Sequence, residues 1–128
     1  MFKELNINPF GKRTGDCTVR AIGVATGQEW DDVYLDLAIE GLMIKEMPSD
    51  NDVWPSYLRH EGFVRHVIPD TCPDCYTIRD FAEDHPKGRY IVATGSHVVA
   101  VIDGDYYDTW DSGDAVPIYY YAKENENA

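Results

Sequence analysis

The stretch Gly15-Asp16-Cys17-Thr18-Val19-Arg20-Ala21-Ile22 sets a cysteine where a polar loop turns into an apolar helix. The pattern predicts a helix over residues 17–26, which Asp16 caps at its start and Gly27 ends. A thiol at a helix N-terminus lies beside unpaired backbone N–H groups and the positive end of the helix dipole, and both favour the thiolate. Cys17 is therefore a candidate nucleophile.

A histidine and two acids follow in the second half of the chain. His97 precedes an apolar strand over residues 98–102, and Asp103-Gly104 is a strong signal for a hairpin turn into a strand over 105–110. A two-residue turn there places Asp111 beside the His97 end of the hairpin and Asp108 diagonally on the His97 face. Cysteine, then histidine, then carboxylate is a chain order of thiol hydrolases.

These residues resemble the papain-like cysteine peptidase superfamily. The resemblance is closer to small uncharacterised phage and prophage proteins of that superfamily, which carry Gly-Asp-Cys-x-x-Arg-Ala-Ile followed by Ala-Thr-Gly. The chain matches this pattern at residues 15–22 and 25–27, and again over 101–113. The match covers most of the chain, although the Cys-Gly-Ser/Ala-Cys-Trp signature of the large enzymes is absent.

The resemblance implies an α+β fold, in which N-terminal helices carry the cysteine and pack on a C-terminal antiparallel sheet that carries the histidine and the acid. In the superfamily an Asn or Asp just after the second strand orients the histidine and is followed by Ser. Asp111-Ser112 fits that pattern better than Asp108-Thr109. The predicted triad is therefore Cys17, His97 and Asp111, with Asp108 as the secondary candidate.

A second oxyanion donor is harder to assign. The superfamily uses a Gln or Asn shortly before the cysteine, but position 11 is Gly, so the candidates are Asn6, Asn8 and Thr14. The expected activity is hydrolysis of a peptide, isopeptide or other amide without a cofactor. The alternative is a papain-fold protein of phage origin with little or no turnover, which binds or inhibits a host protein.

The rest of the chain predicts helices followed by antiparallel strands in one domain over residues 1–128. A second helix is expected over 30–40, ending at Gly41, and others over 52–60 and 77–84, the last opened by a Thr77 cap with Asp80 three residues on. The remaining strands are expected over 63–68, 89–94 and 116–121.

Composition limits the partners. The formal charge of −12 over 128 residues argues against nucleic acid, whose phosphates need clustered Lys and Arg. No apolar run is long enough to span a membrane, and residues 1–5 lack a signal-peptide core. The expected location is a cytosol, that of the host cell if the protein is phage-encoded. Three cysteines fit a reducing compartment better than a disulfide framework, which leaves Cys17 free.

A competing site is Cys72-Pro73-Asp74-Cys75 with His60, His66 and His85 nearby. Cys-x-x-Cys with histidines can bind zinc, but a structural site needs a second ligand pair at suitable spacing. None of these histidines forms an H-x-x-x-H pair. A solvent-facing loop is therefore the preferred interpretation, and no metal is expected.

Overall fold

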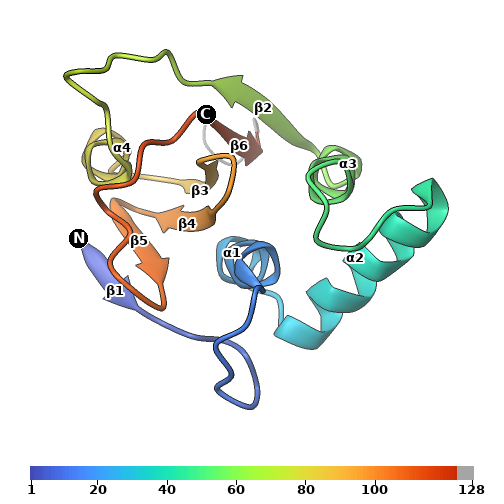
Figure 1. The fold of residues 1–128 in the computed structure, drawn as a ribbon. Helices are drawn as coiled ribbons and strands as arrows, with labels where there is room; N and C mark the ends of the chain where they lie inside the picture. The colour runs from blue at the N-terminus through green and yellow to red at the C-terminus, as the bar shows by residue number, and fades with distance from the viewer. Residues whose placement is uncertain (124–128) are drawn as a thin grey trace.

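The computed structural model describes residues 1–123 as an α+β fold (Figure 1). Within this range the helices are α1 (Cys17–Thr26), α2 (Trp30–Ile44), α3 (Val53–His60) and α4 (Ile78–Asp84). The strands are β1 (Phe2–Glu4), β2 (Phe63–Val67), β3 (Arg89–Ala93), β4 (Val98–Ile102), β5 (Asp105–Asp108) and β6 (Tyr119–Lys123). None of these helices is long and apolar enough to cross a membrane.

The strands form one mixed sheet in the order β1-β5-β4-β3-β6-β2. β2 to β6 pair antiparallel, as expected, but β1 adds a parallel strand beside β5, with Phe2 opposite Tyr106. A purely antiparallel sheet was therefore the wrong prediction. The reason is that a three-residue edge strand is too short to show a period of two in the sequence.

Both faces of the sheet are covered, and the central strands alternate between two cores. Ile91 of β3 and Ala100 of β4 pack with α1, α2 and α3, whereas Val92 and Val99 face the other way toward α4. In Figure 1, α1, α2 and α3 lie to one side of the sheet and α4 to the other. Continuous apolar runs in β3 and β4 reflect this burial on both faces.

The hairpin between β4 and β5 has the predicted turn and register. Asp103 and Gly104 both have positive φ, 49° and 85°, as a two-residue turn of type I′ requires. Ile102 consequently faces Asp105 across the hairpin. β5 ends at Asp108, two residues earlier than expected, and the chain then leaves the sheet.

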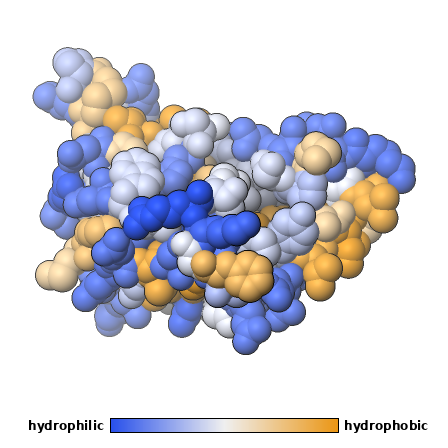
Figure 2. Space-filling model, turned by 60° about the horizontal axis from the view of Figure 1, so that its bottom comes forward, coloured by the Kyte–Doolittle hydropathy of each residue, from blue (hydrophilic) through white to orange (hydrophobic). Residues whose placement is uncertain are grey.

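The C-terminal end of α2 differs from the expectation. α2 does not end at Gly41 but continues to Ile44 and closes at Lys45, whose φ is 63°. Gly41 is buried, and a Cβ there would lie 2.6 Å from the Glu46 carbonyl oxygen, so the glycine permits a close backbone approach instead of ending the helix. The added turn exposes apolar side chains, including Leu42 and Met43, and hydrophobic surface is visible at the right of Figure 2.

The start of α4 has a side-chain cap, and the start of α1 does not. Thr77 accepts a hydrogen bond from the Asp80 backbone N–H, and the Asp80 carboxylate accepts one from Thr77, which is the predicted capping box of α4. Asp16, in contrast, makes no side-chain cap on α1. Its carboxylate instead accepts hydrogen bonds from the Arg20 and Trp30 side chains.

Candidate active site

Cys17 and His97 meet because the first turn of α1 packs on β4. Cys17 is the first residue of α1, and His97 directly precedes β4. The thiol is partly buried and shares a pocket wall with His97 and Val98, whose ring and backbone N–H act to lower its pKa. The two residues that the sequence singles out for nucleophile and base are therefore brought together.

Asp108, and not Asp111, binds the His97 ring. The His97 Nε2 lies 2.6 Å from Asp108 Oδ2, which leaves Nδ1 as the ring nitrogen for Cys17. Asp108 ends β5 on the face that His97 occupies, and diagonal neighbours on one face of a sheet are within reach of each other. The assignment of Asp111 as the orienting acid was wrong.

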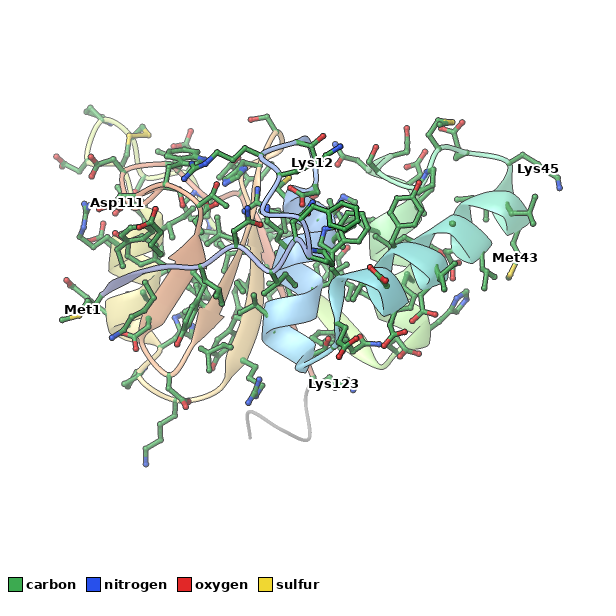
Figure 3. The ribbon with its side chains drawn as sticks, turned by 90° about the horizontal axis from the view of Figure 1, so that it is seen from below. Met1, Lys12, Met43, Lys45, Asp111 and Lys123 are labelled. Atoms are coloured by element: carbon green, nitrogen blue, oxygen red, sulfur yellow. A yellow bond between two sulfur atoms is a disulfide. The ribbon has the colours of Figure 1, made fainter. Side chains whose placement is uncertain are left out.

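Asp111 lies beyond the end of β5, where the chain has already turned away from His97. Its carboxylate accepts hydrogen bonds from the Tyr106 hydroxyl and the Gly113 backbone N–H, and its side chain is half exposed. Figure 3 shows Asp111 on the α4 side of the molecule, well away from α1. Its role in the structure is to hold the loop that follows β5.

A buried arginine connects the two ends of the site. Arg20 donates from Nε to Asp16 Oδ1 at 2.8 Å and from a terminal nitrogen to Asp108 Oδ1 at 3.0 Å. The Trp30 indole N–H donates to the other Asp16 oxygen at 2.9 Å. We call Asp16, Arg20 and Asp108 the arginine bridge. It explains why Asp16 does not cap α1, because its carboxylate is occupied by Arg20 and Trp30.

Both carboxylate oxygens of Asp108 accept hydrogen bonds. Its side chain is 1% exposed and accepts hydrogen bonds from Arg20, from His97, from the Ser112 hydroxyl at 2.7 Å and from the Thr109 backbone N–H at 2.8 Å. A carboxylate with this many donors is held in one orientation and kept ionised. The Ser112 hydroxyl thus binds Asp108, whereas the resemblance had paired Ser112 with Asp111.

The electrostatics favour a charged pair of thiolate and imidazolium. The hydrogen bond to Asp108, followed by that to Cys17, raises the pKa of His97 to about 9. Burial raises the pKa of Cys17, but hydrogen bonds from His97 and the Val98 N–H and the nearby positive charges outweigh it, so the net direction is down. Burial likewise opposes ionisation of Asp108, and the bonds from His97 and Ser112 reverse this and lower its pKa.

The pair opens onto a pocket of about 280 Å³. Its wall includes Ser49 and Asn51 from the loop before α3, Trp54 of α3 and Tyr119 of β6. The Trp110 ring lies 5.1 Å from the His97 ring, centroid to centroid, and partly covers the histidine. Sequence reasoning did not identify Ser49 or Asn51, because no motif marks them and only the tertiary fold brings their loop to the thiol.

Oxyanion donors are only partly accounted for. The Cys17 backbone N–H lies in the first turn of α1, where no side chain caps the helix. The predicted second donors lie elsewhere: Asn8 donates to Asp16 at 3.4 Å, Asn6 donates to the Lys12 carbonyl at 3.1 Å, and Thr14 lines a neighbouring pocket instead. None of the three lines the Cys17 pocket.

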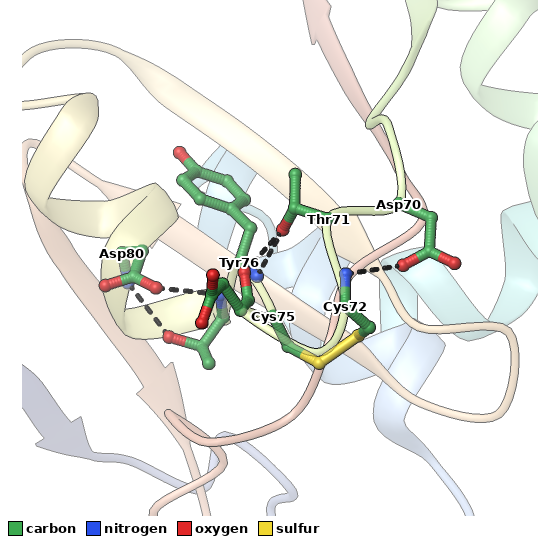
Figure 4. The surroundings of a disulfide bond; sticks show 8 residues. Asp70, Thr71, Cys72, Cys75, Tyr76 and Asp80 are labelled. Carbon is green, nitrogen blue, oxygen red and sulfur yellow. Dashed lines mark hydrogen bonds between the residues drawn. A yellow bond between two sulfur atoms is a disulfide. The ribbon is translucent and has the colours of Figure 1, made fainter.

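The Cys-x-x-Cys loop forms a disulfide (Figure 4). Cys72 and Cys75 are joined by a bond of 2.00 Å, which differs from the expectation of reduced thiols. The loop is largely solvent-facing, as expected, and is held by Asp70, which accepts from the Cys72 N–H, and by Thr71, which accepts from the Tyr76 N–H. Within residues 1–123, Cys17 is the free cysteine.

One carboxylate cluster has ligand atoms close enough to hold a cation. Oxygens of Glu46, Asp50 and Asp52 all lie within 4.8 Å of one another on the loop before α3. Asp50 raises the pKa of Glu46 by hydrogen bonding and charge repulsion. Exposed acidic groups often gather in this way without a cation, so the cluster by itself does not indicate a metal site.

The grouping of Cys17, His97 and Asp108 with the arginine bridge is thus established by the contacts of this chain alone. Comparison with protein-family models, with curated proteins and with solved structures found no match.

Proposed function

We propose that this protein is a cysteine-dependent hydrolase of peptide, isopeptide or related amide bonds, with a papain-like arrangement of its reacting groups. The observation that carries the proposal is the arrangement of Cys17 and His97 on one pocket wall, with the His97 ring bonded to the buried Asp108 and with Cys17 and His97 shifting each other's pKa toward the charged forms. A nucleophile, a base and an acid that orients the base are the three parts that such chemistry requires.

In the proposed reaction the Cys17 thiolate attacks the carbonyl carbon of the substrate, and a tetrahedral oxyanion forms. The Cys17 backbone N–H donates to that oxygen. The His97 imidazolium gives its proton to the leaving amine as the C–N bond breaks, which leaves an acyl group on sulfur. Water then attacks the thioester, His97 takes its proton, and the C–S bond breaks, which releases the acid product and restores the Cys17 thiolate beside the His97 imidazolium.

Asp108 and the arginine bridge position His97 for this reaction. Asp108 fixes the ring orientation and stabilises the imidazolium, and Arg20 holds Asp108 against both the sheet and α1. Because Arg20 also binds Asp16, the residue before the nucleophile, one side chain sets the position of α1 relative to the hairpin.

A second candidate function is a binding protein that retains the constellation but turns over slowly or not at all. It is favoured by one observation: none of Asn6, Asn8 and Thr14, the donors expected to complete the oxyanion site, lines the Cys17 pocket. Removing one such donor typically costs about 10²–10³ in rate.

The experiment that tests the proposal uses p-nitrophenyl acetate as an activated acyl donor. We expect a burst of nitrophenol and an acetyl adduct on Cys17 in the intact mass, followed by slow release. Digests of a peptide library should in addition show new termini. His97→Gln should suppress both, and Cys17→Ser should abolish the adduct.

Asp111→Asn is the matched control, because it removes an exposed carboxylate from the same loop. It should leave adduct formation unchanged. Adduct formation at Cys17 without any peptide cleavage would favour the binding protein, and absence of the adduct would overturn the hydrolase.

A further inference from the structure

A second pocket adjoins the one that contains Cys17. Its volume is also about 280 Å³, and it shares Asn51 and Tyr119 with the Cys17 pocket. Beyond this shared wall it is lined by Arg59 of α3, Arg65 of β2 and Tyr121 of β6. In Figure 1, α3, β2 and β6 lie together on one side of the molecule. A chain bound at Cys17 would therefore meet these residues next.

The two arginines are held in place by aromatic rings and not by acids. The Arg65 guanidinium carbon lies 4.4 Å from the centroid of the Tyr119 ring, and Arg59 lines the same pocket as Tyr121, where its charge acts to lower the pKa of the Tyr121 hydroxyl against the effect of burial. Among residues 1–123 neither arginine takes part in an ion pair. Guanidinium groups stacked on a ring keep their edges free for planar anions.

The charge of this pocket is opposite to that of the molecule. Asp52 is its one acidic lining residue against Arg59 and Arg65, so the lining itself is net positive, while the Glu46 and Asp50 carboxylates lie beside Asp52 outside the lining. The chain as a whole carries a formal charge of −12. A cationic lining on an acidic protein would attract an anion that the rest of the surface repels.

We propose that Arg59 and Arg65 bind a carboxylate of the substrate, within two residues of the bond that Cys17 attacks. This inference rests on the proposed function, and it names the substrate class: a peptide with an acidic group near the reacting carbonyl. The carboxylate is either an acidic side chain or a free C-terminus, since both present the same two oxygens to a guanidinium.

The test measures alkylation of Cys17 by three iodoacetyl dipeptides. Iodoacetyl-Gly-Gln-amide is neutral, iodoacetyl-Gly-Glu-amide carries the side-chain carboxylate, and iodoacetyl-Gly-Gln with a free C-terminus carries the terminal one. At low salt and limiting probe, we expect one or both acidic probes to react about fivefold faster than the neutral probe, as an ion pair of about 1 kcal/mol gives.

The double variant Arg59→Gln, Arg65→Gln should bring this ratio to about one. Both side chains are exposed, so the variant is expected to fold, and its circular dichroism checks that. The matched control Lys45→Gln, Lys87→Gln removes the same charge from exposed positions outside both pockets and should keep the ratio.

Equal rates for all three probes in the unaltered protein would overturn the proposal, as would a preference that survives in the double arginine variant. The rate with the neutral probe alone reports the nucleophilicity of Cys17. If the neutral probe reacts slowly but the acidic probes still react faster than it does, the result counts against the hydrolase. The same result supports the carboxylate site.

Discussion

Replacing Asp108 by Asn tests the central contact of the site. The substitution keeps the shape of the side chain but removes the charge that holds His97 and Arg20. Asp108 is the largest contributor to the raised pKa of His97, which lies at about 9 against an ordinary value of 6.5. We therefore expect the pKa of His97 to fall toward 6.5 in the variant.

The size of the effect follows from that difference. At about 1.36 kcal/mol for each pKa unit, the full shift from 6.5 to about 9 corresponds to about 3 kcal/mol of stabilisation of the imidazolium, of which Asp108 supplies the largest part and Cys17 the next. The thiolate of Cys17 loses most of its counter-charge above neutral pH. Its alkylation by iodoacetamide at pH 7.5 should slow by roughly tenfold or more, within the range that an oriented general base contributes.

The assay combines the NMR titration of the His97 ring with the pH profile of Cys17 alkylation. Asp111→Asn is the control and should change neither. Asp108→Asn also leaves Arg20 with one partner fewer in a buried site, and breaking such a pair costs about 3–5 kcal/mol. Ser112→Ala, which removes one donor but leaves the Asp108 charge and its bond to Arg20 in place, is therefore measured in parallel and should leave the pKa of His97 raised. A normal His97 titration in Asp108→Asn, or a shifted one in Asp111→Asn, would refute the reasoning.

Four further outcomes are expected. Without reductant, iodoacetamide should label Cys17 alone, and after reduction it should label Cys72 and Cys75 more slowly; peptide mapping checks this, and equal rates at the three thiols would contradict it. In a Cys17→Ala background the free energy of unfolding should fall as the pH rises above 6.5, because Asp108 makes the folded state hold the proton of His97 more tightly than the unfolded state does. Urea titrations should show that His97→Gln removes this slope, and a slope that remains would assign it to another group. Trp54→Ala should cost about 3–5 kcal/mol of stability in the same titration because the ring is fully buried, and a loss below about 1 kcal/mol would argue against the packing described. A chelator should leave the melting temperature unchanged, because both sulfurs of the Cys-x-x-Cys loop are already bonded to each other, and a lower melting temperature would reveal a structural metal.

The sequence was most informative where one local signal dominated. The helix that carries Cys17, the hairpin turn at Asp103-Gly104 and the capping box at Thr77 all depend on residues within a few positions of each other, and the structure has each of them. The contact between Cys17 and His97 was likewise predicted, from residue type and chain order.

Predictions failed where the outcome depended on distant partners. Choosing between Asp108 and Asp111 required knowing where β5 ends, and the chain leaves the sheet directly after Asp108. Asp16 resembled a helix cap, but a buried arginine one turn later bound its carboxylate. The i, i+4 spacing of Asp16 and Arg20 was a signal that could have indicated this pair. No local signal marked Asn51.

The parallel pairing of β1 with β5 has a consequence for the order of events during synthesis. Phe2 pairs with Tyr106, so the first strand emerges from the ribosome long before its partner exists. At about 5–20 residues per second, the wait is on the order of 5–20 s. Cys17 also waits for its partners, because His97 and Asp108 are synthesised in the same late stretch of the chain. The nascent thiol therefore lacks His97 and Val98 as neighbours for most of translation, and these groups lower its pKa only when the sheet closes.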